Sequence, residues 1–389
     1  MDIKLYKDQL DILNRNNKLY SNLYGSMNLA KFLVGNSDFI FSLVGDVGAI
    51  STKVSVETSE SSYIAFSMPY NKWQTITLKF STYSCVNIHV TSKTLRVYTD
   101  ESSDEAIFSI NRYNEYNDPS SIVNEYAVRQ IINNVKSFNE LYMTDELSSN
   151  LDLLHNMFSL QSNGNTIGLG RDSLMYADGS LIVKTKLIEP IQESFFKDTD
   201  EDYVYISDDI INLIGLVDSK SRVFKFTCNY DAIYWNDENT ELYYQGSVQK
   251  SELPSDEDFE NFKPSIDIST ISIPASLLKE SINFFNGVYE NNDWKLLKFS
   301  LSKENGLNLI YTDRDSTVHY TKHVDGIVCD LDSEFNLASD VVKNITDKTL
   351  KRFGATENVN ITYNNDSSTI GILINVSDLY EAILVKLED

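Results

Sequence analysis

The residue types that most often carry chemistry are sparse in this chain, and their spacing suits strands better than metal sites. His319 and His323 are four residues apart, which lets two histidines share a metal ion on a helix, but they lie in the alternating run STVHYTKHV. Four residues of a strand span roughly 13 Å, which is too far for both side chains to reach one metal ion. The sequence therefore predicts no metal site at these histidines.

Two other segments match ligand-binding motifs only in part. The acidic run DTDEDY at 198–203 begins like a calcium loop, but Tyr203 stands at the glycine position and Asp209 at that of the terminal glutamate. We interpret this run as an exposed acidic loop. The GLG at 168–170 lacks the third glycine of a dinucleotide-binding fingerprint.

Searches for catalytic motifs find none in the sequence. The chain has no phosphate-binding loop, no His-Glu-x-x-His, no Gly-x-Ser-x-Gly and no paired-cysteine motif. We therefore expect a protein that is not an enzyme and that needs no metal and no cofactor. A metal-dependent hydrolase is the least favoured alternative.

Cysteine usage and hydrophobicity indicate where the protein works. Cys85, Cys228 and Cys329 are isolated and odd in number, which favours buried free thiols in a reducing cytoplasm. The start MDIKLYKDQL carries charges where a signal peptide needs an apolar run, and no stretch approaches the length of a membrane span. We expect a soluble, cytoplasmic protein with no membrane partner.

The elements that make up the chain follow a repeated pattern. A few alternating residues, typical of a strand, are followed directly by an apolar-periodic stretch, typical of a helix. Fixed-period similarity of this kind indicates copies of one supersecondary unit. The six copies are DIKLYKDQLDIL at 2–13, YIAFSMPYNKWQTI at 63–76, VNEYAVRQIINNV at 123–135, YVYISDDIINLIG at 203–215, TISIPASLLKESI at 270–282 and EFNLASDVVKNIT at 334–346.

The six copies are of two alternating types. After the odd copies come two strands joined by a turn around Asp46, Asp172 or Asp313, and the even copies end in a pair of short strands. One odd and one even copy make a module of ordinary domain size. We expect an α+β fold of three similar modules, at 1–121, 122–265 and 266–389, each with two helices packed on antiparallel sheets.

The net charge of −24 argues against a nucleic-acid partner until its distribution is considered. The six expected helices, at 7–22, 69–80, 125–138, 208–222, 274–288 and 338–352, contain fourteen Lys or Arg and nine Asp or Glu. The rest of the chain contains nineteen basic and forty-eight acidic residues. Cationic helices on an anionic body form a localised electrostatic footprint.

The chain resembles the bacterial-type β sliding clamp, the ring-forming processivity subunit of a replicative DNA polymerase. The resemblance covers nearly the whole chain and is carried by LVGDVGAISTKVSV, LLHNMFSLQSNGNTIGLGRDSLMYADGSLIV, FNLASDVVKNI and AILVKL, in an alternation of six units. The second module departs from the family by its long insert at 187–202. The low similarity and the Asn-, Ile-, Lys- and Tyr-rich composition could indicate a bacteriophage member, acting in the host cytoplasm.

The resemblance implies a ring whose hole is lined by helices and filled by double-stranded DNA. Strands of adjacent modules then join into sheets on the outside, and each helix needs an apolar stripe and a polar face. Long cations on that face attract the DNA backbone without reading its sequence. The candidate DNA-binding residues are Arg15, Lys18, Lys72, Arg129, Lys136, Lys343, Lys348, Lys351 and Arg352.

The resemblance also implies a pocket between modules two and three that accepts a short apolar motif of the polymerase and other partners. Such pockets are usually apolar with a few polar anchors. The matching positions are Leu154 in a strand LLHNMF, Arg171, Ser173, Leu174 and Met175 in the turn GRDSLMY, Pro254, Trp294, Asn336, Val385 and Leu387. The turn departs from the family's Thr-Asp-Gly-His-Arg-Leu, so the partner motif should differ.

A clamp of three modules per chain closes as a head-to-tail homodimer. Its expected partners are double-stranded DNA, the replicative DNA polymerase and a clamp loader. The first alternative is a monomeric or open processivity factor that holds DNA on a basic face. The second, from another class, is a β-rich phage structural or sugar-binding protein.

Overall fold

The computed structural model describes residues 1–23, 29–35, 37–45, 48–58, 62–112, 135, 137–158, 166–177, 181–217, 222–246, 253–265, 268–286, 296–312, 319–330, 332–339, 342–343, 345–347, 354, 357–364, 371–376 and 379–385. They divide into two compact units, of which the first comprises 1–143 with 209–247 and the second 144–208 with 248–389. This division runs through the predicted second module, so the three predicted module boundaries remain a prediction.

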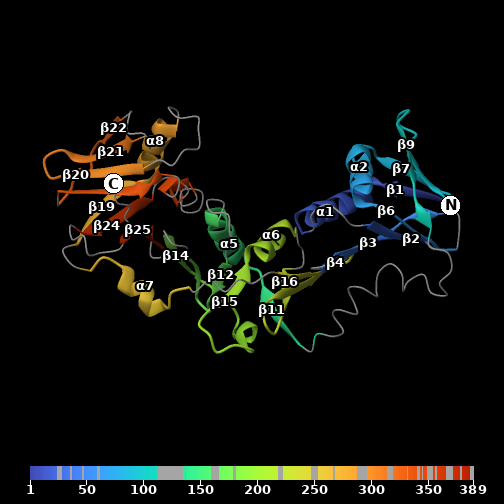
Figure 1. Cartoon of the computed structure of the whole chain (residues 1–389), viewed down its shortest axis with the longest axis horizontal. Coiled ribbons are helices and arrows are strands. Elements are labelled where there is room, and N and C mark those ends of the chain that lie inside the picture. Colours follow the sequence, from blue (N-terminus) through green and yellow to red (C-terminus); the bar gives the residue numbers. More distant parts are fainter. Residues whose placement is uncertain are drawn as a thin grey trace. The chain divides into compact units, whose positions relative to one another are not determined.

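The first unit contains two antiparallel sheets (Figure 1). The five-stranded sheet has the order β5 (Glu57–Thr58), β1 (Asp2–Tyr6), β7 (Cys85–Val90), β8 (Thr94–Tyr98), β9 (Glu105–Ser109). The nine-stranded sheet has the order β10 (Asn111–Arg112), β6 (Ile64–Pro69), β2 (Leu29–Gly35), β3 (Asp38–Gly45), β4 (Gly48–Ser55), β18 (Thr240–Gln245), β17 (Ala232–Asn236), β16 (Val223–Thr227), β11 (Phe138–Tyr142). The helices α1 (Lys7–Leu23) and α2 (Tyr70–Phe80) pack on them, and α6 (Asp208–Leu216) lies almost entirely in this unit.

The second unit repeats this construction. Its eight-stranded sheet has the order β15 (Val204–Ser207), β12 (Thr166–Leu169), β13 (Ser173–Ala177), β14 (Leu181–Lys186), β26 (Tyr380–Val385), β25 (Gly371–Val376), β24 (Asn358–Asn364), β19 (Ile268–Pro274). Its four-stranded sheet has the order β22 (His319–Val324), β21 (Gly306–Thr312), β20 (Leu296–Ser302), β23 (Ser333–Ala338). The helices are α5 (Asp145–Phe158), α7 (Asp256–Phe262), α8 (Ala275–Asn286) and the short 3-10 helix η1 (Glu193–Phe196).

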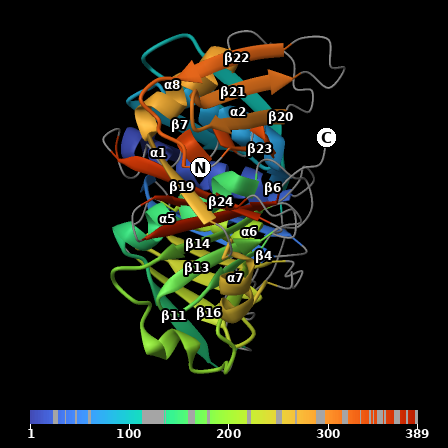
Figure 2. The ribbon, with the colours of Figure 1, turned by 90° about the vertical axis from the view of Figure 1, so that its left-hand side faces the viewer.

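One rule of assembly accounts for all four sheets, apart from the two-residue edge strands β5 and β10. Strands β6, β2, β3 and β4 of the first predicted module continue into the meander β18, β17, β16 and β11 of the second. Strands β15, β12, β13 and β14 of the second module continue in the same way into β26, β25, β24 and β19 of the third. The remaining two sheets are the corresponding halves alone: β23, β20, β21 and β22 of the third module, and β1, β7, β8 and β9 of the first. Figure 2 shows β20, β21 and β22 side by side, with α8 packed against β22.

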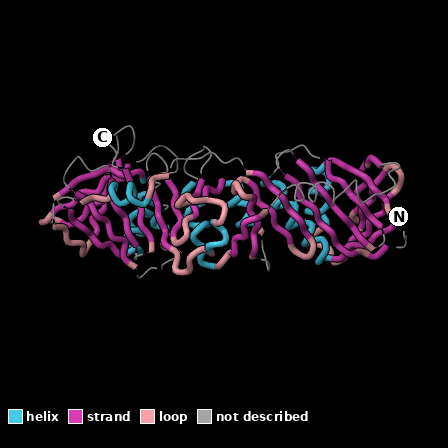
Figure 3. The backbone as a smooth tube through the Cα atoms, turned by 90° about the horizontal axis from the view of Figure 1, so that it is seen from below, coloured by secondary structure: helices cyan, strands magenta, loops and turns pink. Residues whose placement is uncertain are grey.

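Strands from neighbouring predicted modules therefore pair antiparallel within one sheet. We name the pairing of β4 with β18, which aligns Ile50 with Leu242, the first junction. We name the pairing of β14 with β26, which aligns Ile182 with Ile383, the second junction. In each unit the helices lie beside the strands (Figure 3), so the expected α+β fold is confirmed.

Alternation of apolar and polar residues explains the strands that the sequence predicted. In β19 every second residue is buried, beginning with Ser269 and Ile271, which is typical of a sheet with one face on a core. The core of the first unit is aromatic: the rings of Phe32 and Phe66 stack at 4.8 Å between centroids, and Trp73 of α2 contacts Phe32 edge-on at 4.8 Å. Both histidines of STVHYTKHV lie on β22, so the strand assignment is confirmed.

Two predicted helices differ from the structure. The predicted helix 125–138 lies mostly outside the described residues, and Phe138 begins the strand β11. The strand–helix pair at this point of the pattern is β11 followed by α5, in which Leu147, Leu151 and Leu154 recur at helical spacing and are buried. The predicted helix 208–222 ends early, at Leu216.

The insert at 187–202 is folded against the turn at 170–172. The backbone N–H of Leu187 donates to the Asp172 carbonyl and that of Ile191 to the Arg171 carbonyl, both at 2.8 Å. Phe195 and Phe196 of η1 are buried, and residues 200–202 are exposed as expected for an acidic loop.

The three cysteines are free thiols, but only Cys329 is buried, and Cys85 is half-buried while Cys228 is exposed. No helix within the described ranges is long and apolar enough to cross a membrane.

Candidate functional site

Four of the predicted pocket residues that the structure describes lie on two elements of the second unit that pack together. Ser173, Leu174 and Met175 are buried on β13, and Leu154 is buried on α5, which packs against β13. Leu154 is therefore helical, and its predicted strand LLHNMF is wrong, because apolar side chains repeat every three to four residues there. Pro254 is half-buried and precedes α7, and Asn336 is buried on β23. Trp294 and Leu387 lie outside the described residues, as does the side chain of Val385 on β26.

The helix α7 is short and has strong end signals. Ser255 caps its N-terminus: the Ser255 hydroxyl accepts from the Asp258 N–H at 3.1 Å, and the Asp258 carboxylate accepts in return from the Ser255 N–H at 3.2 Å. Acidic residues in the first turn complement the helix dipole. At the other end Lys263 is extended, with ψ of 143°, because the following Pro264 disfavours helical backbone.

Phe259 of α7 packs on the sheet that contains the second junction. Its side chain is fully buried in a cluster with Met175 of β13, Tyr203 and Ile383 of β26. Ile182 and Leu373 extend the cluster at its edge. Met175, one of the predicted pocket residues, has no exposed surface in this arrangement.

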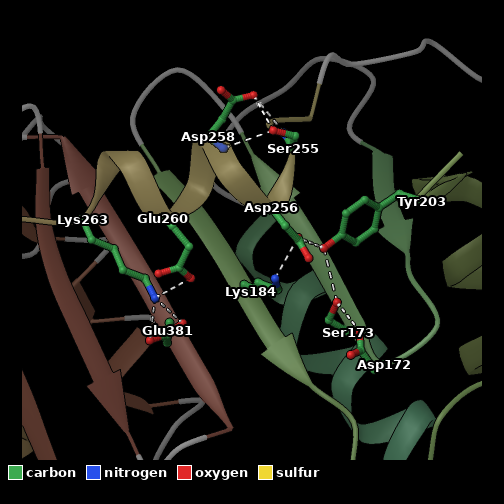
Figure 4. Close-up of polar contacts among 10 residues, drawn as sticks. All are labelled: Asp172, Ser173, Lys184, Tyr203, Ser255, Asp256, Asp258, Glu260, Lys263 and Glu381. Carbon is green, nitrogen blue, oxygen red and sulfur yellow. Dashed lines mark hydrogen bonds and ion pairs between the residues drawn. The ribbon is translucent and has the colours of Figure 1, made fainter.

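A polar network fixes the N-terminal end of α7 (Figure 4). Asp256 accepts from Lys184 of β14 at 2.7 Å and from the Tyr203 hydroxyl at 2.6 Å. Burial raises the pKa of the Asp256 carboxyl, but these two hydrogen bonds outweigh it and the pKa is lowered. Burial, and then the bond to Asp256, raises the pKa of Tyr203, whose hydroxyl also lies 3.2 Å from that of Ser173.

An ion pair fixes the other end of α7. Lys263 bonds to Glu381 of β26 at 2.9 Å and to Glu260 at 2.8 Å. Burial lowers the pKa of Lys263, but the bonds to both carboxylates outweigh it and the pKa is raised. Because Lys184 and Glu381 are paired across the second junction, α7 is tied to both of its strands.

The two ammonium groups also flank the Phe259 ring. The Nζ of Lys184 lies 5.6 Å from the ring centroid and that of Lys263 lies 5.1 Å from it. Cations within about 6 Å of an aromatic face are attracted by its quadrupole. The site therefore favours an aromatic side chain over an aliphatic one of similar size.

The GLG segment makes room for this packing. A Cβ atom at Gly168 would lie 2.5 Å from the Leu253 side chain, and one at Gly170 would lie 2.9 Å from the Tyr203 ring. The glycines thus allow close approach of Tyr203 and Leu253 to β12, which is a packing role.

Arg171 connects the predicted turn to the insert. Its guanidinium pairs with Glu193 at 3.1 Å and lies 5.2 Å from the centroid of the Phe196 ring. The two departures of the second module from the family, the turn and the insert, are therefore in contact with each other.

Sequence reasoning missed the residues that organise this site. Lys184, Asp256, Phe259 and Lys263 were not singled out, and Tyr203 was considered only as part of a calcium loop and as the start of a repeated unit. A usable signal was present: SDED, with serine three residues before an acid, is a capping-box pattern at the start of a helix. The phenylalanines 259 and 262, three residues apart, then define an apolar face.

The candidate DNA-binding residues are only partly described. Lys72 on α2 is exposed, while Lys343 is half-buried and helical. Arg15 on α1 pairs with Asp237 at 2.8 Å, which links α1 to the turn before β18. Lys18 lies on α1 but its side chain is outside the described residues, as are Arg129, Lys136, Lys348, Lys351 and Arg352.

The predicted positive charge of the helices holds for only some of those that the structure describes. Helices α1 and α2 contain five basic and two acidic residues, whereas α5 and α6 contain five acidic residues and no Lys or Arg. Helix α8 has one of each sign. The expected excess of basic over acidic residues came largely from 125–138, 217–222 and 348–352, which are not described as helix.

Comparisons with known proteins bear on the fold. No protein-family model and no curated protein sequence matches the chain. Among solved structures, the DNA polymerase sliding clamp of Caulobacter crescentus matches with a TM-score of 0.72 at 11% identity, over 100% of both chains. The DNA polymerase III subunit beta of Borrelia burgdorferi matches with a TM-score of 0.68 at 12% identity, over 100% of this chain and 98% of that one. The Helicobacter pylori beta clamp, solved with a DNA ligase peptide, matches with a TM-score of 0.67 at 13% identity, over 100% of both. The chain therefore has the fold of the bacterial sliding clamps over its full length.

Proposed function

We propose that this protein is a sliding clamp: two copies close a ring around double-stranded DNA and tether the replicative DNA polymerase. The observation that carries the proposal is the rule of sheet assembly. Two eight-stranded arrangements are complete within the chain, and two halves, ending at β22 and β9, are left over. By the rule, β22 of one copy pairs with β9 of the second, as β4 pairs with β18 and β14 with β26. Two such pairings close the chain pair head to tail.

The exposed edges support this dimer. Ile107 lies in the middle of β9 and is 62% exposed. An edge strand with an exposed apolar residue tends to pair with a strand of another chain. Both strands lie at the end of their sheets, β9 in the five-stranded sheet and β22 in the four-stranded one, so each has an edge that a strand of a second copy can extend. This arrangement favours the closed dimer over a monomeric or open factor.

The DNA would be held by sequence-independent attraction. Helices α1 and α2 contain most of the basic residues of the described helices, with Lys72 exposed among them. We assign DNA contact to Arg15, Lys18, Lys72 and Lys343, and to the further candidates Arg129, Lys136, Lys348, Lys351 and Arg352. The charges of α5 and α6 would repel DNA, so attraction should be uneven around the hole.

The partner site completes the proposal. The Helicobacter pylori clamp was solved with a ligase peptide, which supports a peptide site in this fold. We place the corresponding site at Met175 and its neighbours on β13 and β26, with Pro254, Trp294, Asn336, Val385 and Leu387 as further candidates. A clamp loader would open the ring. No catalytic role is proposed, and the protein would act in the cytoplasm of a bacterium or of a phage's host.

A topological assay tests the ring. Protein loaded on nicked circular DNA should be retained, and should be released when the circle is cut once. Ile107→Asp should make the chain monomeric in sedimentation and abolish retention, while Ile188→Asp, at an isoleucine 70% exposed elsewhere, should change neither. Equal retention on cut and uncut DNA would contradict the ring and favour the open factor. Absence of any DNA retention by a folded dimer would favour a structural or sugar-binding role.

A further inference from the structure

The helix α7 contacts charged and apolar side chains of the sheet beneath it, as a bound peptide would. Two of its residues and the residue that follows it face that sheet: Asp256 contacts Lys184, Phe259 packs with Met175 and Ile383, and Lys263 contacts Glu381. Asp256 and Phe259, three residues apart, lie on one face of the helix, and Lys263 follows it in extended backbone. Figure 4 shows Asp256 and Lys263 reaching from α7 to the two strands of the second junction.

The charged and apolar residues of the sheet named above all belong to its strands, so they would form a surface without α7. Lys184 and Glu381 remain opposite each other across the junction, with apolar Met175, Ile182 and Ile383 beside them. This surface offers one cation, one anion and an apolar patch. A ligand that matches it needs an acidic group, an aromatic ring and a basic group in that order.

The helix α7 is also poorly able to hold its form alone. A helix of seven residues is far below the length at which an isolated helix is stable in water, so its order depends on its contacts with the sheet. Apart from Phe259 its residues are exposed or half-buried. Undocking therefore exposes the Phe259 ring, the half-buried Phe262 ring and the apolar surface against which they pack.

We infer that α7 is an internal occupant of the partner site, and that the partner motif is a helical segment with the pattern acid-x-x-aromatic-x-x-x-basic that displaces it. This inference rests on the proposed placement of the partner site at Met175. It adds the chemistry of the motif and the state of the site: Met175 is fully buried, so no partner side chain reaches it until Phe259 leaves. A tethered occupant competes at a high effective concentration, which keeps weak or partial motifs out.

Binding of a peptide in trans tests the inference. The probe is the acetylated peptide of residues 254–264, PSDEDFENFKP, and the partner is the full chain with Phe259→Ala. Apparent affinity is reduced by the fraction of the protein that is closed, so the variant should bind the peptide at least about tenfold more tightly than the unchanged chain does. Phe335→Ala is the control, because Phe335 is also buried in this unit but contacts the rings of Phe299, at 5.2 Å, and of Tyr363 on β24, at 5.7 Å, and is not part of the Phe259 cluster.

Variant peptides test the pattern. Alanine at the position of Phe259, or exchange of the charges at Asp256 and Lys263, should each abolish most of the binding to the Phe259→Ala chain. Equal binding by the charge-exchanged peptide would overturn the proposed motif. Equal affinity of the unchanged and Phe259→Ala chains would overturn the internal occupancy, and so would an equal gain in the Phe335→Ala chain.

A cross-linking readout on the unchanged chain removes the dependence on a folded variant. A zero-length carbodiimide reagent should join Lys184 to Asp256, whose atoms are 2.7 Å apart, and Lys298 to Glu334, 2.8 Å apart, as a reference. Peptide at about 1 mM, a concentration comparable with that of a tethered segment, should lower the first cross-link and leave the second unchanged. An undiminished Lys184–Asp256 cross-link would overturn the proposal.

These outcomes separate this inference from the proposed function. If the peptide displaces α7 but the protein shows no topological retention on DNA, the internal occupant stands and the clamp function fails. If Met175→Asp abolishes polymerase stimulation while the peptide never displaces α7, the clamp function stands and the internal occupant is rejected.

Discussion

The two junctions between modules have the same backbone construction and differ in their surroundings. Each joins the last strand of a hairpin to the last strand of a meander, in antiparallel pairing over five residue pairs. At the first junction an ion pair from α1 to Asp237 lies beside the strands. At the second junction a separate helix, α7, is tied to both strands.

This difference separates what holds the modules together from what makes a site. The strand pairing and the apolar residues beneath it recur at both junctions, so they are sufficient for joining. Two features belong to the second junction: the oppositely charged Lys184 and Glu381, aligned across the two strands, and the apolar cluster that surrounds Phe259. At the first junction the corresponding strands carry Leu242 opposite Ile50 and Tyr243 opposite Ala49. The proposed partner site would then be an addition to one of two junctions that share the same strand pairing.

The largest expected effect tests whether both junctions are structural. Leu242→Ala at the first junction and Ile383→Ala at the second each remove a buried side chain, 0% and 2% exposed. Each should lower the free energy of unfolding by about 2–5 kcal/mol. Chemical denaturation measures this, and a loss at only one junction would show that the two joints are not equivalent. Exposed Ile188→Ala should have little effect.

The next effect distinguishes α7 from the core. Phe259 is as buried as Leu242, yet Phe259→Ala should lower the free energy of global unfolding by clearly less than the about 3–5 kcal/mol typical of a buried phenylalanine. The reason is that α7 can undock locally while the sheet persists. Hydrogen exchange should accelerate in 256–262 and remain slow in β14 and β26. Uniform acceleration across these strands would mean that α7 is part of the core.

The strands and their alternating order could be predicted from sequence because they depend on local periodicity. The hairpin of β3 and β4 and the meander of β24 and β25 both follow from alternation and turn residues. Their pairing partners could not, since β4 and β18 are far apart in the chain and many strands offer a similar apolar face. The resemblance to a clamp supplied the joining of modules, and the structure supplied which strands join.

For the candidate site, the sequence supplied a proposed position, which stays a prediction, and did not supply the contacts around it. Met175 and Leu154 were placed by resemblance, but the neighbours Leu153 and Leu154 followed by His155 suggested a strand where the wider spacing is helical. Four acidic residues in DEDFENF hid an amphipathic helix, because its apolar face consists of only two phenylalanines, of which Phe259 is buried. The helix charge was misjudged for a related reason: a sum over uncertain boundaries included basic residues such as Arg222, which lies beyond α6.

A smaller effect is expected from pH. The pKa of Asp256 is lowered in the docked state, so its contribution to docking is present above the ordinary pKa of an aspartate, about 3.9, and is lost as the pH falls through the lowered value. Lys263, whose pKa is raised, contributes below the ordinary lysine value of about 10.4 and loses its contribution only above it. Docking should be constant through neutral pH and weaken in acid. Binding of the 254–264 peptide to the Phe259→Ala chain should weaken in acid in the same way. Asp256→Asn in the peptide should remove most of this acid dependence, and an unchanged acid dependence would show that another group is responsible.

The smallest expected effect concerns the ion pair at the first junction. Arg15 and Asp237 are 28% and 22% exposed, and Arg15 also approaches the Thr240 hydroxyl at 3.4 Å. A pair of this exposure contributes little beyond about 1 kcal/mol, because water and salt screen it. Arg15→Met, which keeps the length of the side chain, should therefore lower the free energy of unfolding by less than about 1 kcal/mol. If Arg15 also contacts DNA, the same variant should weaken retention on circular DNA more than this loss of stability explains, whereas Asp237→Asn, which leaves the guanidinium in place, should not weaken it. Equal small losses of stability with unchanged retention in both variants would assign Arg15 to the junction alone and leave DNA attraction to residues such as Lys72.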